Sequence, residues 1–215
     1  KKLKEFDNEF KHDKNLYDLL ATNGYLGLGI NEKLNGNGED LYDLGILFEC
    51  LGFYAVPLSL TGCLVDVAQT LQKFSKNDNH QSIVSSITKG EIYTSAILEP
   101  LNHDPENPTT TAVFDGDKVI INGSKYLSEI SSLAKGILIS ASSNKGVILV
   151  LVKTDNVKLT QLTSTANSPL FKVELDNVSI DQSDIVHQEG RGLETLRYLL
   201  QINMVMRSYM ALGVT

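Results

Sequence analysis

The sequence predicts an α+β fold in three consecutive parts. These are an N-terminal helical domain over residues 1–90, a middle antiparallel β-barrel-like domain over 91–189, and the first helix of a truncated C-terminal helical bundle over 190–215. Apolar residues recur at helical spacing as far as Gly90, alternate with a period of two up to about Gly190, and then return to helical spacing. Because no helical stretch separates the β segments, a closed or packed antiparallel sheet is favoured over a β-α-β arrangement.

The helical part begins with a stretch over 15–21, which ends at Asn23-Gly24. A glycine-rich connection over 24–38 follows. The next stretch carries one apolar stripe, formed by Leu41, Leu44, Leu47, Phe48 and Leu51. Pro57 ends it, and further helices are expected at about 60–74 and 81–88.

The β part opens with a hairpin signal, since Asp115-Gly116 suits a tight turn with positive φ between two apolar runs. Further strands are expected at 136–142, 147–152 and 171–180. From Gly192 the helical period returns, with apolar residues at Leu193, Leu196, Leu199, Leu200 and Met204.

The totals are those of an ordinary globular protein: 215 residues, 42% hydrophobic and 21% charged. A net charge of −7 disfavours a general nucleic-acid binder, which needs a basic face. No apolar run reaches the ~18 residues that suggest a membrane span, and no signal peptide opens the chain. A cytoplasmic location is therefore the default expectation. We also expect both ends to be edges of a piece rather than ends of a folded unit.

Familiar catalytic motifs do not emerge from the residues alone. Gly27-Leu28-Gly29 lacks the third glycine and the preceding strand of a dinucleotide fingerprint. The cysteines, Cys50 and Cys63, are expected to be buried reduced thiols. The histidines lie scattered and are expected on the surface or in loops, without a metal site; they are His12, His80, His103 and His187.

Several segments in order resemble the acyl-CoA dehydrogenase family. They are LLATNGYLGLGINEKLNGNG (19–38), DLYDLGILFECLGFYAVPL (40–58), ITKGEIYTSAILEP (87–100), TTTAVFDGDKVIINGSKYL (109–127) and VELDNVSIDQSDIVHQEGRGL (173–193). The resemblance implies a flavoprotein that desaturates an acyl-CoA or acyl-carrier-protein thioester. In such an enzyme a glutamate removes the α-proton and the β-hydrogen leaves as hydride to FAD. That glutamate belongs to the C-terminal domain, so no catalytic residue is assigned here. Family members usually form homo- or hetero-oligomers.

The same resemblance places the expected flavin contacts at Ile97, Leu98, Leu127, Ser128 and Glu129. Leu98 stands where a threonine hydroxyl usually bonds the flavin ring. Without gaps, Leu127 stands at an aromatic position and Glu129 where threonine or serine faces N5. A slip of one residue offers Tyr126 and Ser128 instead. FAD is therefore expected to bind weakly or not at all. An arginine usual at position 204 is replaced by Met204, with Arg207 nearly one turn later.

Three functions remain open from the sequence. The first is an FAD-dependent acyl-thioester dehydrogenase. The second is a non-catalytic family member with a degraded flavin site, which acts as a structural or hetero-oligomer partner. The third is another flavin reaction on the same fold, such as that of an oxidase or oxygenase, since fold alone does not decide function.

Overall fold

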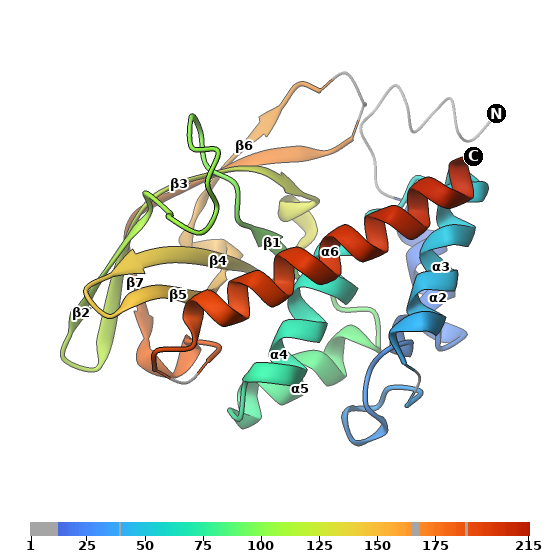
Figure 1. Cartoon of the computed structure of the whole chain (residues 1–215), viewed down its shortest axis with the longest axis horizontal. Helices are drawn as coiled ribbons and strands as arrows, with labels where there is room; N and C mark the ends of the chain where they lie inside the picture. Colours follow the sequence, from blue (N-terminus) through green and yellow to red (C-terminus); the bar gives the residue numbers. More distant parts are fainter. Residues whose placement is uncertain (1–12, 39, 165–167, 188) are drawn as a thin grey trace.

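The computed structural model describes residues 13–38, 40–164, 168–187 and 189–215. Helices come first, a curled sheet follows, and a long helix runs across both (Figure 1). The chain is thus α+β, as predicted. The division into domains at 90 and 189 stays a prediction, and residues 1–12 of the first expected domain lie outside the described residues.

Several of the helices before the sheet begin at side-chain caps. Asp13 accepts a hydrogen bond from the Leu16 amide, and Asp40 accepts one from the Tyr42 amide, so each carboxylate satisfies a free donor of a first turn. The helices are α2 (Lys14–Thr22), α3 (Leu41–Phe53), the π-helix η3 (Thr61–Gln69), α4 (Thr70–Phe74) and α5 (Asp78–Ile87). Short 3₁₀ turns at Tyr25–Gly27 and Glu32–Leu34 shape the glycine-rich connection.

One curled sheet holds all the strands of the described chain. They are β1 (Thr94–Ala96), β2 (Thr111–Asp115), β3 (Lys118–Glu129), β4 (Gly136–Ser143), β5 (Gly146–Lys153), β6 (Lys158–Leu162) and β7 (Leu170–Asp181). Their order is β1-β4-β2-β3-β7-β6, with β5 on the other side of β4. The predicted hairpin is confirmed as β2–β3, which pairs Asp115 with Lys118 around the turn.

The expectation of a purely antiparallel sheet is wrong, because β1 and β2 both run parallel to β4. After the hairpin, β3 continues along β7 for its whole length, and the chain turns back before β4 begins. Alternating hydrophobicity predicts that a strand has a buried face, but it carries no information about the direction of its neighbour.

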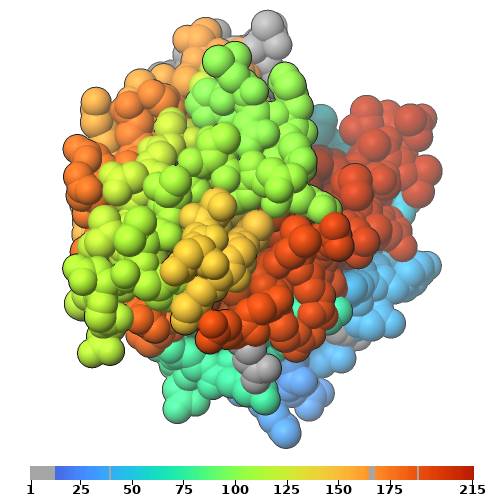
Figure 2. All heavy atoms as spheres, turned by 60° about the vertical axis from the view of Figure 1, so that its left-hand side comes forward, coloured from blue at the N-terminus to red at the C-terminus, as the bar shows by residue number. Residues whose placement is uncertain are grey.

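The last helix, α6 (Gly192–Val214), packs against α3, η3 and β5. Figure 2 shows its first turns beside the β4–β5 hairpin. At its other end the backbones of α3 and α6 approach closely. A Cβ added at Gly52 would lie 2.0 Å from the Met210 carbonyl oxygen, so this crossing requires glycine. Buried side chains of the helices and of α6 form one core with Leu138 and Leu149 of the sheet.

Two expectations about single side chains are wrong. His80 is fully buried, and its Nδ1 lies 2.7 Å from the Ser75 hydroxyl. Cys50 is exposed, because it lies on the outer face of α3, whereas Cys63 is buried as expected. His12 lies outside the described residues. Within the described ranges, none of the helices is long and apolar enough to cross a membrane.

Candidate functional site

A cavity of about 370 Å³ opens where the ends of β1 and β3 meet η3 and the middle of α6. Its walls mix apolar and polar side chains: the sheet and α6 each supply both kinds, and η3 supplies Asp66. The lining residues are Asp66, Ser95, Ala96, Ile97, Leu98, Tyr126, Leu127, Glu129, Leu170, Leu199, Leu200, Asn203 and Arg207. The structure therefore brings Ile97, Leu98, Leu127 and Glu129 together in one hollow, called the sheet–helix pocket below.

Ser128, the remaining expected contact, does not line this pocket. Its hydroxyl donates to the Ser95 carbonyl at 2.7 Å and lies 2.7 Å from the Ser131 hydroxyl, so it is bonded inside the sheet. The pairing of β3 with β7 shifts between Lys125 and Ser128, and Leu127 has a φ of 57°. This bulge lets the consecutive residues Tyr126 and Leu127 both face the pocket.

A buried ion pair lies beneath the pocket and fixes the ends of its strands. The Lys125 ammonium lies 2.7 Å from Glu99 and 3.1 Å from the Ser140 hydroxyl, and the two charged side chains are 0% and 2% exposed. Burial by itself raises the pKa of Glu99, but hydrogen bonds, the strongest from Lys125, hold it well below its usual range. Glu99 is therefore a carboxylate at neutral pH, and it orders the chain directly after Leu98.

Glu129 enters the pocket as a paired carboxylate. One oxygen accepts from the Arg207 guanidinium of α6 at 3.1 Å, and the other accepts from the Ser59 hydroxyl, before η3. These contacts neutralise the charge of Glu129 and connect β3 to two helical elements across the pocket.

Asp66 is the least exposed polar residue that lines the pocket, and no sequence motif had indicated it. It is 5% exposed. Its carboxyl group accepts hydrogen bonds from the Ser95 hydroxyl at 2.5 Å and from the Asn203 amide at 2.7 Å. Burial raises the pKa of Asp66 to about 7, although these hydrogen bonds and the charge of Arg207 oppose the rise. The available signal was a single acid inside the apolar run TGCLVDVAQ, which forms a π-helix, a form that is frequent at functional sites.

The pocket fits a flavin ring in part. Leu98 and Leu127 are 48% and 42% exposed, so they offer an apolar wall to a flat ring. Their side chains carry no donor for the polar edge of the ring. On the α6 side, Arg207 uses two of its five N–H groups on Asn203 and Glu129, and Asn203 uses one of its two on Asp66. The strand residues therefore suit the ring as a packing surface, and its polar edge depends on the remaining N–H groups of α6.

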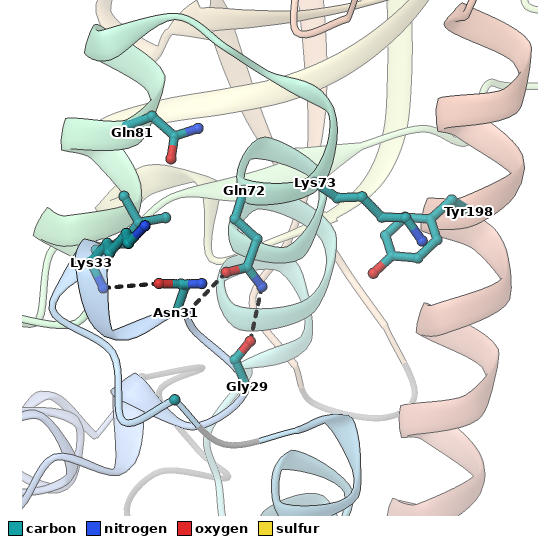
Figure 3. Close-up of a pocket in the computed structure, with 9 residues that line it drawn as sticks. Gly29, Asn31, Lys33, Gln72, Lys73, Gln81 and Tyr198 are labelled. Carbon is teal, nitrogen blue, oxygen red and sulfur yellow. Dashed lines mark hydrogen bonds between the residues drawn. The ribbon is translucent and has the colours of Figure 1, made fainter.

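A second hollow, of about 500 Å³, lies between the glycine-rich connection, α4, α5 and α6 (Figure 3). Gln72 donates to the Gly29 carbonyl at 2.9 Å and accepts from the Asn31 amide at 3.2 Å. Lys73 lies over the Tyr198 ring, 3.7 Å from its centroid. These contacts hold the glycine-rich connection to the helices and assign no chemistry. No cluster of metal-ligating side chains occurs in the part of the chain that the structure describes.

Comparison with known proteins finds relatives in sequence and structures of the same fold. No family model matches the chain. It is 25% identical over 217 residues to the acyl-CoA dehydrogenase FadE12 of Mycobacterium tuberculosis, covering 95% of this chain and 56% of that protein. The chain thus spans about half the length of the curated relatives that it matches.

Two solved structures show the same fold. The ChsE4-ChsE5 complex from Mycobacterium tuberculosis superposes with a TM-score of 0.89 at 21% identity, covering 98% of this chain and 57% of that chain. The prolyl acyl carrier protein oxidase AnaB gives a TM-score of 0.91 at 19% identity, covering 100% of this chain and 61% of that chain.

Proposed function

We propose that the chain, which is similar to acyl-CoA dehydrogenases in sequence and in fold, forms the flavin-facing wall of an acyl-thioester oxidoreductase. One observation carries the proposal. The positions that the resemblance assigns to flavin contacts, Leu98, Leu127 and Glu129, line one pocket although they come from separate segments. The expected substrate is a CoA or carrier-protein thioester.

When bound, FAD would supply the hydride acceptor for α,β-desaturation of the acyl group. The role of the chain's own residues is to bind and orient the flavin and the substrate. Leu98 and Leu127 pack against the ring, and Leu199 and Leu200 of α6 exclude water from the opposite side of the pocket. The base that removes the α-proton is not assigned to a residue of this chain.

Flavin binding is expected to be weaker than in a family member with the usual side chains. Leu98 and Glu129 replace two hydroxyl groups, and Leu127 replaces an aromatic ring. Two lost hydrogen bonds and one lost aromatic contact cost roughly 1.5–4.5 kcal/mol together. The dissociation constant for FAD should therefore rise by about one to three decades.

Titration of FAD, followed by flavin fluorescence, tests the proposal. The double variant Leu98→Thr/Glu129→Thr restores both hydroxyl groups and should bind FAD more tightly than the natural chain. The control is Leu133→Thr/Glu189→Thr, which makes the same exchanges at exposed positions outside the sheet–helix pocket. Equal FAD affinity in all three proteins would contradict the assignment of these residues to a flavin wall.

A non-catalytic family member is the second candidate, and the pairing of Glu129 favours it. A carboxylate tied to Arg207 and Ser59 reinforces the pocket wall at a position where a hydroxyl group usually contacts flavin. If this candidate is correct, neither the natural chain nor the double variant retains FAD, and the purified protein is colourless.

A further inference from the structure

The sheet–helix pocket contains one carboxyl group whose partners are all uncharged. Asp66 is bonded to the Ser95 hydroxyl and the Asn203 amide, and no ion pair joins it to a cation among the described residues. Ionised carboxylates that are this deeply buried are ordinarily paired with a cation. Asp66 therefore has an unmet preference for a proton or for a positively charged group.

Among the described residues, Arg207 is the cation whose charge acts on Asp66, opposing the effect of burial on its pKa, but its hydrogen bonds go to other groups. Arg207 donates to Glu129 at 3.1 Å and to the Asn203 side-chain oxygen at 2.9 Å, so its guanidinium forms a chain with the other carboxylate. The charged groups that line the pocket are thus Asp66 from η3, Glu129 from β3 and Arg207 from α6. With Asp66 ionised, their sum is one negative charge.

Apolar residues surround the rest of the hollow. Ala96 and Leu170 from the sheet and Leu199 and Leu200 from α6 line the same space as Asp66. A ligand that matches both features has a short hydrocarbon chain and a cationic group at its end. Burial of its apolar surface stabilises the hydrocarbon part of the ligand in the pocket, and its cationic group supplies the charged partner that Asp66 lacks.

We propose that Asp66 binds a protonated amine on the acyl group of the substrate, so that the pocket selects amino-substituted acyl chains over plain alkyl chains. This rests on the proposed function, because it places the acyl group of the substrate in the same pocket, beside the residues expected to face the flavin. Binding of the amine requires Asp66 to be ionised. Since burial raises the pKa of Asp66 to about 7, binding should strengthen as the pH rises through that value.

Two small probes of equal length, n-butylammonium and butanoate, test the proposal on the chain itself by ligand-observed NMR titration. Both keep their charge between about pH 6 and pH 8. At about pH 8 the natural chain should bind n-butylammonium about tenfold more tightly than butanoate. At about pH 6 the preference should fall severalfold, because Asp66 is then mostly protonated.

Asp66→Asn should abolish the preference, because it keeps the shape of the side chain and removes the charge. The matched control is Asp43→Asn, which removes a carboxylate from a separate apolar hollow between α2 and α3 and should leave the preference unchanged. Butanoate binding as tightly as n-butylammonium, or a preference that survives in Asp66→Asn, overturns the proposal. If Asp66→Asn does not fold, the pH dependence of the natural chain decides alone, and a preference independent of pH overturns it.

Neither probe contains a thioester, and the assay needs no flavin. An amine preference that depends on Asp66, in a chain that does not bind FAD, supports this inference and counts against the proposed function. FAD binding without an amine preference supports the proposed function and overturns this inference.

Discussion

Replacing Asp66 by asparagine is expected to stabilise the protein at neutral and mildly alkaline pH. The pKa of this carboxyl group is 3.8 in its ordinary state and about 7 in the folded protein, where burial disfavours the charged form. Between these values the folded state binds a proton that the unfolded state has released. The contribution of Asp66 to the free energy of unfolding therefore falls as the pH rises from about 4 to about 7, and it is constant above that.

The magnitude follows from the same difference. About three pKa units correspond to roughly 4 kcal/mol, which is an upper value because Ser95 and Asn203 would lose part of their hydrogen bonding to the new amide. Asparagine does not titrate. Asp66→Asn should therefore exceed the natural chain in stability by up to about 4 kcal/mol at pH 8, and by little or nothing near pH 4.

Urea unfolding followed by circular dichroism, repeated at several pH values, measures the difference between the two proteins. Asp43→Asn again serves as the control. The difference in the free energy of unfolding between this variant and the natural chain should not show the same dependence on pH. A difference between Asp66→Asn and the natural chain that does not change with pH refutes the reasoning, as does a loss of stability at pH 8. A group that costs stability and is nonetheless present fits a binding role, because functional sites commonly reduce stability.

Four further predictions concern the buried ion pair, the crossing of α3 with α6 and the exposed face of α6. Lys125→Met should lower the free energy of unfolding by about 3–5 kcal/mol, measured by urea titration, because it leaves the buried Glu99 without its cation. In the natural chain the low pKa of Glu99 stabilises the fold above about pH 4, and this contribution is lost as the pH falls further, which acid titration of stability will show. Gly52→Ala should cost about 1–3 kcal/mol in the same assay, since the added methyl group would meet the backbone of α6, and an unchanged midpoint would contradict that crossing. The exposed Met204 and Leu212 on α6 predict association, so sedimentation at micromolar concentration should give a dimer or larger species, and Met204→Lys/Leu212→Lys should shift it toward the monomer; a monomeric natural chain argues against this.

Local chemistry made much of the fold predictable. The Asp115-Gly116 turn, the apolar stripe of α3 and the helical spacing after Gly192 each depend on neighbours in sequence, and the structure has the hairpin and both helices there. Strand direction was not predictable, because it depends on how the chain returns after β3. The short strand β1 and the largely exposed strand β6 lack an alternating apolar pattern of useful length, so neither was predicted from periodicity.

Residues of the candidate site were predictable only where their distance from neighbouring motifs matched the family pattern. Leu98, Leu127 and Glu129 were placed by their distance from neighbouring motifs and line one pocket. Ser128 was not distinguishable from them, because the bulge that turns its side chain inward depends on the pairing of β3 with β7. Asp66 and Asn203 are 137 residues apart, so no local pattern indicated that their side chains meet.

Two departures from the family pattern that look unrelated in the sequence form a single feature of the structure. In the register that the resemblance gives, Glu129 on β3 stands where a hydroxyl residue is usual and Met204 where an arginine is usual, with Arg207 three residues later. A shift of three residues keeps a side chain on nearly the same face of a helix. From that face Arg207 donates to Glu129 and to Asn203, and Asn203 in turn donates to Asp66. A carboxylate alone on this wall would repel an electron-rich flavin and destabilise the fold, whereas the pair is close to neutral. The two changes therefore make physical sense together, as one exchange of hydroxyl chemistry for an ion pair. This exchange leaves Asp66 as the carboxyl group of the pocket without a cationic partner among the described residues.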